Sequence, residues 1–132
     1  MNRKARSNRR IDMRNLPTTL DWRIKAMTAV ERVRAAEHRF SWSIGEDETA
    51  ALAAADELQI ATREAMTWLA ATPCPDSKLW AEVARMLNAC EELAAAAQRM
   101  AASPVVDSED ARGQLRQLLV VVDHYSHALD TW

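Results

Sequence analysis

The sequence predicts an all-α protein, an up-down-up-down four-helix bundle preceded by a basic, flexible N-terminal arm. Three observations lead to this fold class. Alanine, the strongest helix former, supplies 25 of the 132 residues, whereas glycine occurs only twice. Four stretches carry apolar residues at alternating spacings of three and four, which is the period of an amphipathic helix. Helix start and stop signals separate these four stretches from one another.

Residues 1–15 are polar and charged without helical periodicity, so we expect them to form the arm. The remaining residues, 16–132, are expected to form the bundle as one domain, because a chain of this length leaves little room for a second core. The arm is followed by four predicted helices, which are justified in turn below.

The first helix is expected over residues 17–43. Pro17 suits a first helical position, and Thr18 supplies a polar group near that start. Gly45 ends the helix, and the acidic residues behind it favour the positive end of the next helix dipole. The apolar stripe of this first helix consists of Trp22, Ala26, Ala29, Val33, Ala36 and Phe40.

The second helix is expected over residues 47–71 and the third over residues 77–102. Two adjacent apolar stripes on the second helix indicate neighbours on two sides. Pro73 and Pro75 separate the two helices, because proline cannot continue a helical ladder, and Asp76 or Ser77 is expected to cap the third helix. The third helix carries a heptad stripe made of Leu79, Val83, Met86, Cys90, Leu93, Ala97 and Met100.

The fourth helix is expected over residues 108–131, after the break at Pro104. Gly113 in its first turns costs about 1 kcal/mol relative to alanine, so this helix is expected to start late or to fray. Short loops require consecutive helices to pack antiparallel, which gives the bundle. Two long helical hairpins that dimerise are the alternative architecture. The stripe of the fourth helix consists of Ala111, Leu115, Leu118, Val122, Tyr125, Leu129 and Trp132.

Charge is divided sharply between the arm and the bundle. Residues 1–16 hold six basic side chains against Asp12, a balance of +5, and the rest of the chain holds eleven basic and eighteen acidic side chains, a balance of −7. Such an arm is typical of segments that bind nucleic-acid phosphates, although a solvated tail, a segment docked on its own acidic helices and an organelle transit peptide are alternatives. The basic residues are Arg3, Lys4, Arg6, Arg9, Arg10 and Arg14.

The two cysteines indicate a reduced, cytoplasmic protein. Cys74 lies in the loop between two prolines, whereas Cys90 lies about 14 residues into the following helix, roughly 20 Å away. A disulfide requires Cα atoms within about 7 Å, so Cys90 is expected to be a buried free thiol. No stretch approaches the roughly 20 apolar residues of a membrane span, so we expect no membrane partner.

The sequence lacks the motifs of helical-bundle enzymes. No histidine has a glutamate three residues before it, as di-metal carboxylate bundles require, and none forms the Arg-x4-His pattern of RNA-cleaving bundles. The interior stripes hold no carboxylate. Asp123, His127 and Asp130 share one face of the fourth helix and are weak zinc candidates, but that face is expected to point to solvent. We therefore expect no cofactor, no catalytic residue and no small-molecule substrate.

A second apolar patch lies opposite the main stripe of the first helix. Contiguous exposed apolar patches usually mark interaction sites, so this patch predicts a protein partner or self-association. Alternatively, Ile11, Met13 and Leu16 of the arm fold over it. The favoured hypothesis is a non-enzymatic adaptor, regulator or inhibitor, with nucleic-acid binding by the arm as the alternative and a metal-dependent enzyme as a remote one. The candidate partner-binding residues are Leu20, Ile24, Met27 and Trp42.

Overall fold

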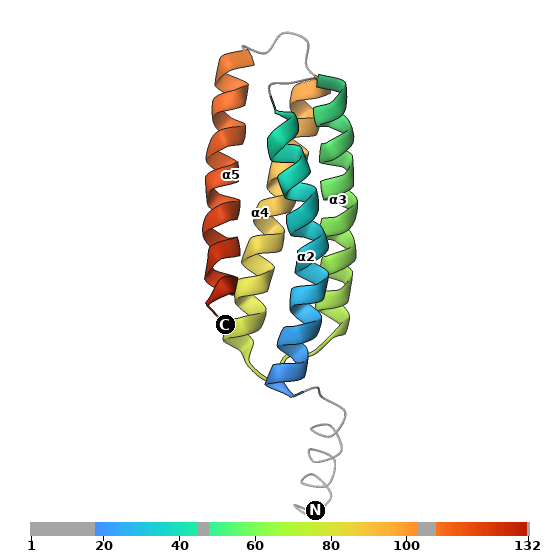
Figure 1. The fold of residues 1–132 in the computed structure, drawn as a ribbon, viewed down its shortest axis with the longest axis vertical. Helices are drawn as coiled ribbons and strands as arrows, with labels where there is room; N and C mark the ends of the chain where they lie inside the picture. Colours follow the sequence, from blue (N-terminus) through green and yellow to red (C-terminus); the bar gives the residue numbers. More distant parts are fainter. Residues whose placement is uncertain (1–17, 45–47, 103–107, 132) are drawn as a thin grey trace, which may run out of the picture.

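A computed structural model of the chain describes residues 18–44, 48–102 and 108–131, and within these ranges it contains four helices and no strands. The four helices lie side by side and alternate in direction (Figure 1). The predicted fold class, a four-helix bundle, is therefore confirmed, while the basic arm lies outside the described residues. The helices are α2 (Thr19–Ser43), α3 (Glu48–Ala71), α4 (Ser77–Ala102) and α5 (Ser108–Asp130).

Side-chain caps set the starts of two helices. Thr18 is the N-cap of α2, and its hydroxyl oxygen accepts a hydrogen bond from the Asp21 backbone N–H at 3.1 Å. The helix thus begins at Thr19 and not at the proline expected to start it, because a threonine side chain satisfies a free N–H of the first turn. At α4, Asp76 is the capping residue, and its Oδ1 accepts from the Lys78 N–H at 2.9 Å.

Helix α4 lies at the centre of the packing, with extensive contacts to α3 and α5 and smaller ones to α2. Its predicted heptad stripe is buried from Leu79 to Ala97. The facing helices contribute small buried residues such as Ala26, Ala36 and Ala55. Small side chains at these seams allow the backbones to approach closely, and the larger residues of α4 fill the space between them.

Two tryptophans link the helices at the end of the bundle where α3 ends and α4 begins, which is the lower end in Figure 1. The Trp22 Nε1–H of α2 donates to the Thr72 carbonyl, and the Trp80 Nε1–H of α4 donates to the Leu69 carbonyl, each at 3.3 Å. The last carbonyls of a helix lack the usual i+4 partner, so they can accept from side chains of other elements. The Leu69 carbonyl also accepts from the Thr72 N–H at 3.4 Å. Trp22 also contacts Trp68 of α3, with ring centroids 5.6 Å apart.

Helix α5 is attached differently from the other three helices. It buries Leu115, Val122 and Leu129, which are spaced by seven residues, and it packs mainly against α4. Within the described ranges, its backbone does not approach α2 as closely as the other neighbouring helices approach one another. Figure 1 shows that α5 also stops short of the lower end of α2. None of the described helices is long and apolar enough to cross a bilayer.

One buried polar group in the core leads to a stability prediction. Thr62 of α3 is fully buried, and its hydroxyl has no hydrogen-bond partner. Thr62→Val replaces this hydroxyl with a methyl group of similar size, so we expect it to raise the free energy of unfolding by about 1 kcal/mol. Thr67→Val is the matched control, because Thr67 is exposed and donates to the Arg63 carbonyl. Urea unfolding of both variants tests this, and equal effects would contradict it.

Candidate functional site

The predicted partner-binding residues of α2 lie on its outward side, with one exception. Leu20 is 65% exposed, Ile24 is 59% exposed and Trp42 is 75% exposed. Met27 is only partly exposed and packs against the core. Leu20 and Ile24 are four residues apart and therefore neighbours on the helix surface. We call Leu20, Ile24 and the exposed part of Met27 the lower α2 patch.

The lower α2 patch lies on the side of α2 opposite its buried stripe, and it lies beyond the end of α5. Asp130, the last residue of α5, pairs with Arg34, which lies ten residues beyond Ile24. Ten helical residues span roughly 15 Å, so among the described residues α5 provides no neighbour for the first turns of α2. Figure 1 shows this difference in height between the two helices.

Trp42 does not belong to this patch. It lies 18 residues after Ile24, which corresponds to about 27 Å along the helix. Glu31 and His38 are exposed on the helix between them. The structure thus places one predicted contact residue at the far end of α2, where it is a separate exposed aromatic side chain.

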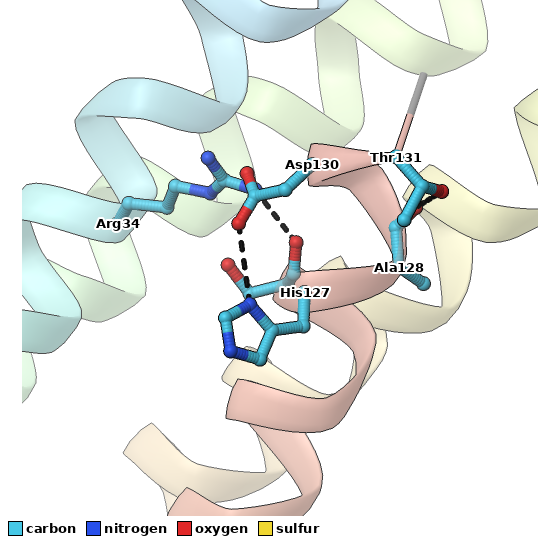
Figure 2. Close-up of polar contacts among 6 residues, drawn as sticks. Arg34, His127, Ala128, Asp130 and Thr131 are labelled. Carbon is cyan, nitrogen blue, oxygen red and sulfur yellow. Dashed lines mark hydrogen bonds and ion pairs between the residues drawn. The ribbon is translucent and has the colours of Figure 1, made fainter.

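A single arginine makes the polar contact between α2 and α5. The Arg34 Nη2 donates to the Ser126 carbonyl at 2.7 Å and pairs with Asp130 Oδ1 at 2.9 Å. Figure 2 shows the guanidinium of Arg34 facing the end of α5. A cation at a helix C-terminus interacts favourably with the helix dipole. The long side chain of Arg34 thus bridges the two helices.

The weak zinc candidates are engaged in this same contact. Asp130 lies between Arg34 and His127, with His127 Nδ1 at 3.3 Å from its Oδ2 (Figure 2). The hydrogen bond with His127 and the charge of Arg34 lower the pKa of Asp130. Asp123 and His127 are exposed on the same helix. Among the described residues, no group of three or more His, Cys, Asp or Glu side chains is arranged to hold a metal ion.

Glu37 corrects an expectation from the sequence. The interior stripes were expected to contain no carboxylate, yet Glu37 is only 7% exposed. The expectation was wrong because the apolar stripe predicted for the first helix includes Ala29 and omits Val30, which is fully buried. Val30 and Glu37 are seven residues apart and share a face, so the heptad spacing from Val30 is the signal that identifies Glu37.

Glu37 lies near an acidic group and a thiol from two other helices. Burial, followed by the charge of Asp123 on α5, raises the pKa of Glu37, while His38 opposes this effect. Burial, followed by the charges of Glu37 and Asp123, raises the pKa of Cys90 on α4 to about 12. Cys90 is therefore a buried, protonated thiol, as the sequence predicts, and it lacks the thiolate that nucleophilic or metal-binding cysteines require.

The alternative site, the basic arm, lies outside the described residues. Its six cations are Arg3, Lys4, Arg6, Arg9, Arg10 and Arg14. Comparison of the chain with protein-family models, curated proteins and solved structures finds no match.

The buried position of Glu37 predicts how stability changes with pH. The pKa of Glu37 is higher in the folded state than the ordinary value of 4.5. Its contribution to stability is therefore fully present below about pH 4.5 and is lost as the pH rises through the folded-state pKa. Glu37→Gln should raise the free energy of unfolding at pH 7 by on the order of 1 kcal/mol, and this gain should disappear near pH 4.

Urea unfolding of wild type and variant between pH 4 and pH 8 measures this difference. Glu31→Gln is the matched control, because it removes an exposed carboxylate from the same helix. A pH-independent difference between wild type and Glu37→Gln would contradict the assignment of Glu37 as a buried titrating group.

Proposed function

We propose that this protein is a non-enzymatic interaction module of the cytoplasm, acting as an adaptor, regulator or inhibitor of a protein partner. The observation that carries the proposal is the lower α2 patch, with two large aliphatic side chains more than half exposed on a stretch of α2 that α5 leaves uncovered. Burying one such side chain against a partner contributes roughly 1.5–3 kcal/mol, so a small patch contributes substantially to binding.

The shape of this region favours a helical partner. An amphipathic helix packed along the outward side of the first turns of α2 would cover Leu20 and Ile24. This mode of binding uses apolar anchors at spacings of three and four on the incoming helix.

The first experiment compares Ile24→Asp with Ile60→Asp. Ile60 of α3 is 60% exposed, so the two variants make the same substitution at equal exposure on different helices. We expect Ile24→Asp alone to abolish capture of the partner, or self-association where the partner is a second copy, because a charge then opposes burial of the patch. Quantitative affinity capture from source cells measures binding of a partner, and sedimentation velocity of the purified protein measures self-association.

Both variants should retain wild-type helicity and unfolding midpoints within experimental error, so that a loss of binding does not reflect unfolding. If Ile24→Asp and Ile60→Asp lose the same partners, the loss reflects general surface charge and not the lower α2 patch. If neither variant changes capture or sedimentation, the patch is not an interaction surface.

A second candidate function rests on the charge of the arm. With a balance of +5 over residues 1–16, the arm is suited to neutralise several phosphates, while the bundle is acidic. Full-length protein should then bind labelled duplex and single-stranded nucleic acid with an affinity that falls steeply with salt. A protein that begins at Leu16 should lose this affinity. Equal binding by the two proteins would rule out the arm as the nucleic-acid site.

A further inference from the structure

A groove between α2 and α3 has the composition of a small-molecule site. Its volume is about 340 Å³, and alanines line its walls. The indole of Trp68 forms an aromatic part of the lining. Pockets for small molecules are mostly apolar, with a few polar groups at the edge, and have volumes from about 300 Å³ upward.

The groove exists because three small residues occur where the two helices face each other. Ala29 of α2 and Ala61 and Ala65 of α3 fill little of the space between the helices. Trp68 contacts Trp22 in the core, with ring centroids 5.6 Å apart and planes inclined at 37°. Trp22 is fully buried and hydrogen-bonded, so it supports the Trp68 ring from inside and leaves the groove side of that ring accessible.

The rim of the groove carries more positive than negative charge. Lys25 and Arg32, two helical turns apart on α2, face Glu64 of α3. Arg32 and Glu64 are 4.0 Å apart and largely exposed, which makes a weak pair that a bound anion can replace. Lys25 forms no ion pair with any residue that the structure describes. The net cationic rim beside an indole therefore complements a ligand that is both aromatic and negatively charged.

We propose that this groove binds a planar aromatic anion, with its ring against Trp68 and its carboxylate or sulfonate against Lys25 and Arg32. Ring stacking on the indole and apolar contact with the alanines supply affinity, and the two cations orient the ligand. This site is separate from the lower α2 patch, because it opens between α2 and α3 and shares neither Leu20 nor Ile24.

The test uses 2-naphthoate and its neutral analogue 2-naphthylmethanol, titrated into the full-length protein and followed by backbone amide NMR. We expect saturable shifts confined to residues near 25–32 and 61–68, with a dissociation constant on the order of 1 mM for a ligand of this size. The neutral analogue should bind at least about five-fold more weakly, because it lacks the charge that the rim recognises.

Three variants separate the groove from general surface binding. Lys25→Gln should weaken 2-naphthoate at least about three-fold and leave 2-naphthylmethanol unchanged. Ala61→Leu should abolish binding of both compounds by filling the groove, whereas Lys78→Gln, at an exposed lysine of α4 that does not line the groove, should have no effect. Absence of saturable shifts, equal binding of the two compounds, or full binding by a folded Ala61→Leu variant would overturn the proposal.

Discussion

The packing of three helices around the apolar stripe of α4 is the constraint on which the rest of the structure depends. A stripe of large residues on α4 is buried against helices whose seams are rich in alanine, so α2, α3 and α4 approach closely. Close approach brings the tryptophans of α2 and α4 within reach of carbonyls at and just after the end of α3. The lower end of the bundle is thus held by apolar packing and by these hydrogen bonds between helices.

Helix α5 is attached to the bundle differently from the other helices. It packs on α4 through three residues at heptad spacing, but toward α2 it is joined by the contact of Arg34, and the charge of Asp123 contributes to the raised pKa of Glu37. A polar contact of this kind needs well-placed partners, since unpaired buried charge is unfavourable. The first turns of α2 lie beyond this contact, and their outward surface is covered by no described element.

The two proposed sites differ in the size of the side chains that form them. Large aliphatic residues on the outward side of α2 form a patch suited to a helix, whereas small residues between α2 and α3 leave a groove suited to a flat ligand. Neither site contains an activated nucleophile, and the buried thiol of Cys90 is held protonated by its surroundings.

The sequence by itself determined the four helices, the burial of the α4 stripe and the outward position of Leu20 and Ile24. All of these follow from local periodicity and capping, which act within a single helix. Only the tertiary structure decided that Glu37 lies near Asp123 and Cys90 of two other helices, and that the groove beside Trp68 stays open. These features depend on which neighbour covers each flank of a helix and on where each helix ends beside the next. Periodicity within one helix carries no information about either, because burial at a flank is set by the partner helix.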